Sequence, residues 1–377
     1  MNGQSLYIHI PFCQAKCVYC DFCSYAGLES IFDSYTAALV QEMTRQSPAV
    51  IKTIYIGGGT PTVLPLSHLA RILNMARQLF DLAPGAEISV EANPGTVDAP
   101  MLAELRALGV NRLSLGMQSL DDSELALLGR IHTASEAVES FQAARQAGFK
   151  NLSLDLIFGL PGQSLESWTS TLDRALALGP DHLSLYALSV EDGTPLAASI
   201  DRGDMAAPDP DQAADLYETA RDTLAEAGYL HYEISNWARN AACQCRHNLT
   251  YWRNEPYLGV GAGAHSWQDG QRRANLPSPQ EYSRQVLDGK APTASQEVID
   301  APLNMAETMM MGLRLLEEGV SFARFRERFD LDLDQHYAQE LEELARFGLI
   351  ETSDQAVRLS RQGHLLGNQV FYRFLPG

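Results

Sequence analysis

Three cysteines near the start of the chain are the residues with the clearest chemical potential. Cys13, Cys17 and Cys20 form a C-x3-C-x2-C array directly after an apolar run at residues 6–10. Thiolates bind soft metals, and closely spaced cysteines commonly hold cube-type iron–sulfur clusters. A [4Fe–4S] cube has one more iron than this array has cysteines, so one iron keeps an open position for another ligand. The array therefore predicts a cluster that can bind a small molecule.

Two other uses of these cysteines remain open at this point. A structural zinc site needs a fourth ligand, which Cys23 or the distant pair Cys243 and Cys245 could supply. Secreted disulfides need an export signal and a small chain. Four of the six cysteines lie between residues 13 and 23, which fits a metal and a reducing cytoplasm better than a disulfide framework. The spacing favours the cluster over zinc.

Composition sets limits on the class of protein. The chain has 377 residues, a formal net charge of −19 and a pI of about 4.8. This acidic balance argues against a nucleic-acid surface, which needs a basic patch. We expect no signal peptide, because no basic segment followed by a long apolar stretch opens the sequence. No apolar run of about 18 residues predicts a membrane span. A cytoplasmic protein is expected.

Residues 1–235 alternate between short apolar runs and longer helical patterns, which predicts an α/β fold with parallel strands and crossover helices. The expected strands are at residues 6–10, 53–56, 87–91, 112–116, 152–158 and 182–188. The expected helices between them are at 32–46, 67–80, 99–108, 135–148 and 164–178. A partial seventh unit follows, with a helix at 211–227 and a strand at 232–234. Because a closed TIM barrel has about eight such units, we expect an open, partial (β/α)6 barrel.

The rest of the chain divides into two further parts. Residues 236–300 lose the strand–helix rhythm and are expected to be an irregular connection. Residues 301–377 predict a smaller, mostly helical domain of winged-helix type, with helices at 304–317, 321–329, 333–347 and 361–374 and a hairpin at 349–352 and 356–359. Its acidic runs favour a lid or packing role over DNA reading.

Polar and glycine residues stand where the expected strands end, which is the face that carries function in α/β barrels. Consecutive glycines at 57–59 let backbone amides approach a ligand, although an ordinary tight turn is the alternative. Glu91 could bind an ammonium or ribose hydroxyls, and it could equally cap a helix. An acid within an apolar run, such as Asp155, needs partners if it is buried, and a structural salt bridge is as good an explanation. Together these strand ends predict a binding crevice.

Over nearly its whole length the sequence resembles the oxygen-independent coproporphyrinogen III oxidase-like branch of the radical S-adenosylmethionine (SAM) superfamily. The matching segments are YIHIPFC at 7–13, GGGTPT at 57–62, EANPG at 91–95, NRLSLGMQS at 111–119, LGRIH at 128–132, DLIFGLPGQ at 155–163 and HLSLYAL at 182–188. The resemblance implies a radical SAM barrel and a [4Fe–4S] cluster on Cys13, Cys17 and Cys20, with SAM chelating the open iron. It also implies SAM contacts at Tyr7, Tyr19, Gly58, Gly59, Thr60, Glu91, Gln118, Arg130 and Asp155.

Two branches of this family differ near the cysteines and in a later motif. The oxidase branch, which decarboxylates coproporphyrinogen III, has a longer segment before the cysteines and a fourth cysteine one residue beyond the third. Here twelve residues precede Cys13, and two residues separate Cys20 from Cys23. The haem chaperone branch carries H-N-x-x-Y-W, which is present at residues 247–252. The sequence is therefore similar to the radical SAM haem chaperones rather than to the oxidases, and zinc binding is the weakest alternative.

The chaperone resemblance implies haem as a further ligand and acceptor haem proteins as partners. His247 is the expected axial ligand, since imidazole binds haem iron well. The alternative of equal weight is that His247 orients the loop or contacts the cluster region through Asn248. His265 is a second candidate, Cys23 is expected to be a free thiol near the cluster, and Cys243 and Cys245 to be bystanders. A flavodoxin- or ferredoxin-like electron donor, a homodimer and membrane contact through the acceptors are also compatible with the resemblance.

Overall fold

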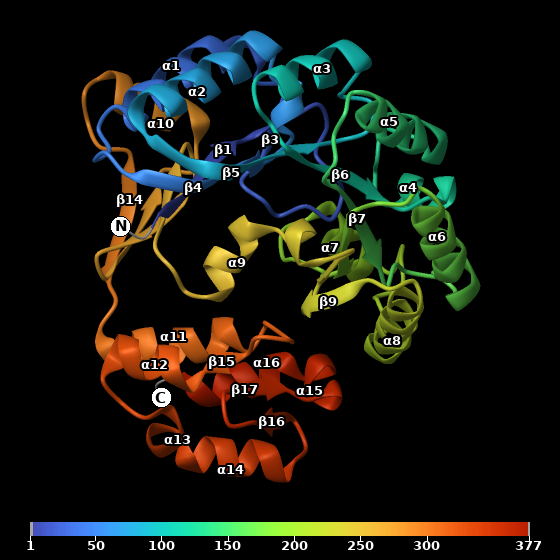
Figure 1. Cartoon of the computed structure of the whole chain (residues 1–377). Helices are drawn as coiled ribbons and strands as arrows, with labels where there is room; N and C mark the ends of the chain where they lie inside the picture. Colours follow the sequence, from blue (N-terminus) through green and yellow to red (C-terminus); the bar gives the residue numbers. More distant parts are fainter. Residues whose placement is uncertain (1–2, 376–377) are drawn as a thin grey trace.

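The computed structural model describes residues 3–375, and its largest element is one open sheet of twelve strands (Figure 1). Its two edge strands, β14 and β9, do not pair with each other, so the barrel is not closed. In spatial order the strands are β14 (Thr293–Val298), β13 (Gln271–Asn275), β12 (His265–Gln268), β11 (Tyr257–Val260), β1 (Gln4–Ile10), β4 (Val50–Gly58), β5 (Asp81–Ala92), β6 (Arg112–Gln118), β7 (Leu152–Phe158), β8 (His182–Ala187), β10 (Asn236–Ala238) and β9 (Leu230–Glu233).

Six neighbouring strands of this sheet, β1 and β4 to β8, run parallel, as the repeating pattern predicts. Parallel strands need crossover connections, and helices on the outer face supply them (Figure 1). These helices are α1 (Phe32–Met43), α2 (Leu66–Leu79), α3 (Ala99–Ala107), α5 (Ala134–Gln146), α6 (Leu165–Ala177) and α8 (Pro210–Glu226). The expected open barrel of six strand–helix units is confirmed.

The main hydrophobic core lies between this sheet and its helices. Leu6, Ile8 and Ile10 of β1 are completely buried, and α2 buries Leu69 and Ile72 against the sheet. The remaining surface of α2 is polar, so its apolar stripe fixes which side faces the strands. This packing holds the carboxyl ends of the parallel strands, where the polar residues lie, on a rigid frame.

Residues 236–300, expected to be irregular, contribute five strands to the large sheet, β10 to β14. They also form two helices, α9 (Arg246–Trp252) and α10 (Pro279–Leu287). β11 lies next to β1 and parallel to it, with Tyr7 opposite Gly259, although the two strands are about 250 residues apart in the chain. Short strands with glycines carry little periodic signal, and a pairing between distant segments has none in a local pattern. The division of the chain at residues 235 and 300 stays a prediction.

The C-terminal part is mostly helical and contains a three-stranded sheet in the order β15-β17-β16. Two helices expected to be continuous are broken, one at Tyr337 and one at Leu366. The ring of Tyr337 packs against Phe374 in a separate apolar core, which explains why the chain turns there. The elements are α11 (Ala301–Gly312), β15 (Val320–Ser321), α12 (Phe322–Phe329), α13 (Leu333–His336), α14 (Ala338–Arg346), β16 (Ile350–Thr352), β17 (Ala356–Leu359), α15 (Arg361–Leu365), α16 (Gly367–Phe371) and the 3-10 turn Tyr372–Phe374.

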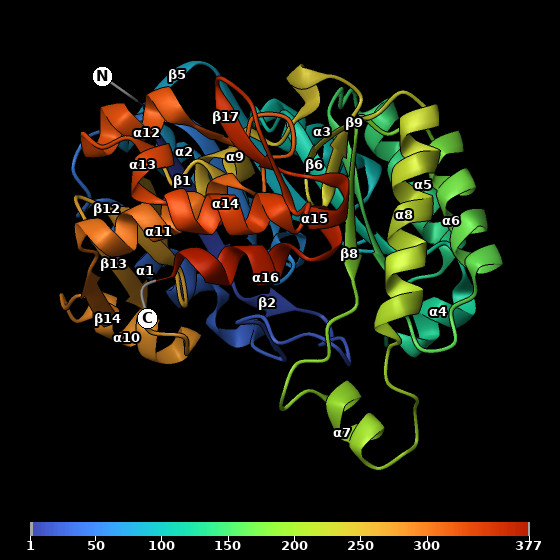
Figure 2. The same ribbon diagram turned by 90° about the horizontal axis from the view of Figure 1, so that it is seen from below.

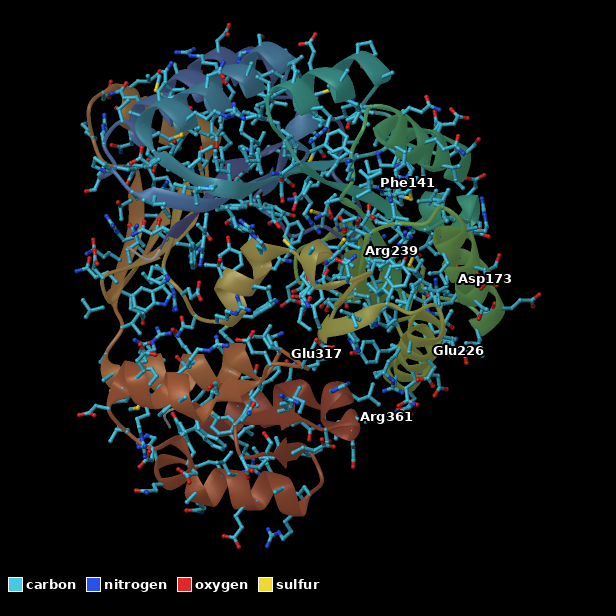
Figure 3. The ribbon with its side chains drawn as sticks, in the orientation of Figure 1. Phe141, Asp173, Glu226, Arg239, Glu317 and Arg361 are labelled. Atoms are coloured by element: carbon cyan, nitrogen blue, oxygen red, sulfur yellow. The ribbon has the colours of Figure 1, made fainter. Side chains whose placement is uncertain are left out.

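Backbone and ionic contacts join the C-terminal part to the barrel. The amide of Leu316 donates to the carbonyl of Tyr232 at 3.0 Å. Arg361, labelled in Figure 3, lies where the C-terminal part meets α8 and contacts Asp222 at 3.2 Å. Helix α9 lies between the sheet and the C-terminal helices (Figure 1). Within residues 3–375, no helix combines the length and the apolar character that crossing a membrane requires.

Candidate cluster and cofactor site

The three-cysteine array lies in a loop that begins where β1 ends. The short strands β2 (Phe12–Cys13) and β3 (Tyr25–Ala26) pair in parallel and close this loop at its base. Val18, at the middle of the loop, bonds through its backbone to Leu128 and to Leu196. Leu196 belongs to α7 (Pro195–Asp201), and Figure 2 shows β2 and α7 at the same end of the molecule. The loop is therefore anchored on the barrel mouth by two neighbouring connections.

Cys13, Cys17 and Cys20 line one cavity of about 420 Å³ at this mouth. Each sulfur has a polar neighbour: Thr60 Oγ1 donates to Cys13 at 3.6 Å, Arg130 Nη1 donates to Cys17 at 3.2 Å, and Ser24 Oγ lies 3.8 Å from Cys20. Hydrogen bonds of this kind stabilise thiolate ligands and tune the potential of an iron–sulfur cluster. The thiols, their shared cavity and their donors fit a cluster with three protein ligands.

The remaining cysteines do not join this cavity. Cys23 donates to the carbonyl of Pro277 at 3.2 Å, and Cys245 is buried beside Glu87, whose Oε1 lies 3.8 Å from its sulfur. Over residues 3–375, no three Cys, His, Asp or Glu side chains converge on a point that would suit a single metal ion. A zinc ion draws its ligands to within about 2.3 Å of one point, whereas each cysteine of a cubane binds a different iron. The cysteines expected as a fourth zinc ligand, Cys23, Cys243 and Cys245, do not line the cavity that holds the three-cysteine array.

The glycine turn after β4 forms one wall of the cavity. Gly58 has a φ of +116°, and a Cβ there would lie 2.4 Å from the ring of His9. A Cβ at Gly59 would lie 2.7 Å from the carbonyl oxygen of Phe12 and 3.1 Å from the Cys13 sulfur. Both positions require glycine because the backbone passes so close to the cysteine loop. The sequence predicts that these glycines let a ligand approach the backbone. The structure shows that they also let the end of β4 pass close to the end of β1 and the cysteine loop.

Glu91 lies one residue before the end of β5, between the glycine turn and Tyr55. Tyr55 Oη donates to Oε1 at 2.7 Å, and the Gly58 amide donates to Oε2 at 3.1 Å. Burial is the main reason that the pKa of Glu91 rises to about 7, with a further contribution from Asp155. The carboxyl group therefore changes charge near neutral pH, which suits a group that binds a cation.

Arg130 connects the cysteine loop to the end of β6. Its Nη1 bonds to Cys17, while Nη2 donates to Asn93 Oδ1 and to the Gly116 carbonyl, each at 2.8 Å. Its buried Nε has no partner among the described residues. Nearby, Gln118 has a φ of +64° at an irregularity in the β6–β7 pairing. Strained polar residues of this kind concentrate at binding sites. The guanidinium group of Arg130, which is planar and has one unused donor, suits a carboxylate ligand.

Asp155 lies on the inner face of β7 among hydroxyl groups. Ser114 Oγ donates to its carboxylate at 3.0 Å and Ser153 Oγ at 3.3 Å. Burial raises the pKa of Asp155, while these donors and the buried Arg112 oppose the rise. The hydrogen bonds from these serines supply the partners that a buried carboxylate needs, so Asp155 requires no direct salt bridge.

The structure brings all but one of the residues expected to contact SAM to the cysteine cavity. The exception is Tyr7, whose hydroxyl bonds to His9 Nδ1 at 2.9 Å and which lines a second, neighbouring cavity. The residues that line the first cavity are Tyr19, Gly58, Gly59, Thr60, Glu91, Gln118, Arg130 and Asp155. Asn248 also lines it, in agreement with the expected reach of this segment toward the cluster region. Sequence reasoning did not single out Asn93, Arg112 or Ser114, which line it as well. Asn93 could have been found, because it lies in the quoted EANPG segment.

The H-N-x-x-Y-W motif forms α9, whose first amides donate to the buried Glu87. His247 is completely buried, with Nδ1 bonded to Thr53 at 2.8 Å and Nε2 to the Tyr251 hydroxyl at 2.9 Å. Burial lowers the pKa of His247 to about 3, so the ring is neutral. His247 does not line the cysteine cavity, whereas Asn248 does. Its assignment as a haem ligand stays a prediction, and in this arrangement both of its ring nitrogens are occupied.

These groups suit a zwitterionic ligand placed beside a cluster. The cavity is lined by carboxyl groups that can bind a cation, among them Glu91 and Asp155, by two guanidinium groups that can bind a carboxylate, and by open backbone at the glycine turn. SAM has an ammonium, a carboxylate and a sulfonium, so the donor set fits that cofactor. An open α/β barrel with three cysteines at its carboxyl face defines the radical SAM class.

Comparisons with known proteins agree with this class. Residues 7–175 match the model of the Radical SAM superfamily, and residues 300–366 match the HemN C-terminal domain. Coproporphyrinogen III oxidase (HemN) from Escherichia coli has a similar structure, with a TM-score of 0.85 at 26% identity, covering 99% of this chain and 90% of that one.

Relatives of known designation cover from 83% to 99% of the chain. Heme chaperone HemW of Bacillus subtilis (strain 168) is 40% identical over 99% of both chains. HemW of Escherichia coli (strain K12) is 39% identical over 83% of both. The mouse radical S-adenosyl methionine domain-containing protein 1, mitochondrial, is 35% identical over 99% of this chain and 87% of that one. The chain belongs to the radical SAM haem chaperone family, within the group of oxygen-independent coproporphyrinogen III oxidase-like proteins.

The position of Glu91 predicts that SAM binding depends on pH. Because burial places the pKa of Glu91 at about 7, its ionised fraction increases as the pH rises through neutrality. We expect SAM to bind about fivefold to tenfold more tightly at pH 8 than at pH 6, since only the carboxylate attracts the ammonium. Equilibrium dialysis of reconstituted protein with labelled SAM measures this change. Glu91→Gln keeps the hydrogen-bonding shape and should abolish most of the pH dependence; an unchanged slope would contradict the assignment.

Proposed function

We propose that this protein binds haem and delivers it to acceptor haem proteins, and that it carries a [4Fe–4S] cluster with SAM on the open iron. The observation that carries the proposal is the nearly full-length similarity to proteins designated heme chaperone HemW. The H-N-x-x-Y-W motif, the hallmark of the chaperone branch that the sequence resembles, supports it from within the sequence.

The residues of the first cavity have separable roles in this proposal. Cys13, Cys17 and Cys20 would hold the cluster, and Arg130 would both support the Cys17 sulfur and meet the SAM carboxylate. Glu91 would bind the SAM ammonium through the carboxylate oxygens that Tyr55 and Gly58 already orient. When bound, the cluster and SAM supply one-electron chemistry. The side chains of the cavity would orient the cofactor, and the buried walls of the cavity would limit the access of water.

A haem-transfer assay tests the function rather than the cofactor. The reconstituted protein is loaded with haem, separated from free haem and mixed anaerobically with an apo haem protein. We expect the acceptor spectrum to appear faster than from haem on serum albumin, because a chaperone must release its cargo to a partner. Equal rates from both donors would contradict the proposal.

The competing function is decarboxylation of coproporphyrinogen III, which the structural likeness to HemN favours. The same preparation, reduced and supplied with SAM and coproporphyrinogen III, distinguishes the two. Protoporphyrinogen formation at an enzymatic rate would replace the chaperone proposal. The electron donor, the homodimer and contact with a membrane through the acceptors stay predictions.

A further inference from the structure

A second cavity of about 350 Å³ lies beside the cysteine cavity, between strands β1, β11 and β12 and the end of the cysteine loop. Gly58, Glu91 and Phe22 line both cavities, so the two are direct neighbours. The residues that line only the second are Tyr7, His9, Cys23, Tyr251, Tyr257, Gly263 and His265. Two of these residues are expected from the sequence to bind ligands: Tyr7 to contact SAM, and His265 as a second candidate for the haem ligand.

Aromatic rings form much of its wall. Tyr251 and Tyr257 meet edge to face with their centroids 4.7 Å apart, and Tyr7 lies on the adjacent strand β1. Phe22, at the tip of the cysteine loop, is 67% exposed. An exposed aromatic side chain beside an aromatic wall suits a flat apolar ligand.

Three histidines lie in or next to this cavity, and only one of them can offer a ring nitrogen. His9 bonds to Tyr7 Oη through Nδ1 and to the Cys23 carbonyl through Nε2 at 2.8 Å. His247 lies behind the wall, with both ring nitrogens bonded. His265 begins β12 and is exposed, and no side-chain hydrogen bond to it occurs among residues 3–375. Partial burial of the His265 ring and the nearby Arg272 lower the pKa of His265, which favours the neutral imidazole.

We infer that His265 supplies the imidazole that binds haem iron in the second cavity, and that His247 positions Tyr251 as part of its wall. The inference rests on the proposed function, because it names the site of that same cargo. Haem is a planar apolar ring whose iron commonly takes one histidine ligand, which matches an aromatic wall with one available imidazole. The haem would then lie next to the SAM and cluster cavity, with Glu91 and Gly58 between them.

The role of His247 follows from its contacts. Its Nε2 lies 2.9 Å from the Tyr251 hydroxyl, and its ring stacks on Tyr55 with centroids 5.1 Å apart. His247 and Tyr251 are four residues apart on α9, so the helix presents them on one side. Removing His247 would free the Tyr251 ring to move but would not remove a ligand from iron.

The experiment titrates ferric haem into the reconstituted wild type and into His265→Ala, His247→Ala and Cys23→Ser, with optical and electron paramagnetic resonance spectra. We expect His265→Ala to weaken haem binding about tenfold or more, to lose the histidine signature and to regain it with free imidazole. His247→Ala should keep the wild-type ligand signature with a smaller loss of affinity. Cys23→Ser should resemble the wild type.

The outcomes separate this inference from the proposed function. If the wild type binds no haem, both fail. If the wild type binds haem but His265→Ala has an unchanged spectrum, or if the signature changes only in His247→Ala or Cys23→Ser, the ligand assignment alone fails. Retention of about four irons per chain and of SAM binding in His265→Ala shows that the neighbouring cavity is intact and that the variant is folded.

Discussion

Replacing Cys17 with serine is expected to abolish the iron–sulfur cluster. After anaerobic reconstitution the iron content should fall from about four per chain to less than one, because two cysteines cannot hold a cubane. Serine is close to cysteine in size, and Cys17 lies in a partly exposed loop, so the barrel should still fold. Iron analysis and the visible absorption of the cluster measure the loss, and far-ultraviolet circular dichroism checks the fold.

Cys23→Ser is the matched control for this change. Cys23 belongs to the same loop but lies in the second cavity and contacts Pro277 rather than the other three thiols. Its replacement should leave the iron content at about four per chain. A wild-type protein that takes up one zinc and no iron, or a Cys17→Ser variant that keeps its irons, would overturn the cluster assignment.

The parallel half of the fold could be read from the sequence because each strand and helix carries its own period. β7 has the limits that its apolar run predicts, and α6 begins at the capping residue Ser164. β11 could not be found in the same way: it is short, contains Gly259, and acquires its place only through pairing with β1. The breaks at Tyr337 and Leu366 likewise depend on tertiary packing, which a helical pattern does not report.

The candidate site was predictable where a side chain follows directly from its strand end. Glu91 is the penultimate residue of β5 and Gln118 the last residue of β6, so their positions along the strands locate them. Tyr7 and His247 show the limit of this reasoning. Tyr7 lines the second cavity and His247 is buried behind its wall, so neither lines the cavity of the cysteines. Which of two adjacent cavities a buried ring faces depends on the pairing of β1 with β4 and β11.

Gly58 shows how tightly the backbone constrains the cofactor cavity. Its amide donates to Glu91, its φ of +116° is one that other residues rarely adopt, and its Cα hydrogen faces the ring of His9. A side chain here must therefore disturb the glycine turn, the position of Glu91 and the start of the cysteine loop together. This turn belongs to both cavities, so its geometry affects SAM and the proposed haem site alike.

Gly58→Ala is expected to destabilise the protein by about 3 kcal/mol, because backbone strain and a steric clash each contribute roughly 1–3 kcal/mol. SAM binding should fall below detection, since the methyl group would displace His9 and the amide that orients Glu91. Urea unfolding and equilibrium dialysis measure the two effects.

Gly148→Ala is the matched control: Gly148 has a φ of +88°, but nothing lies within 4 Å of the added Cβ. It should cost about 1 kcal/mol and leave SAM affinity unchanged. Equal losses in the two variants would show that strain alone, and not the contact with His9, makes glycine necessary at position 58.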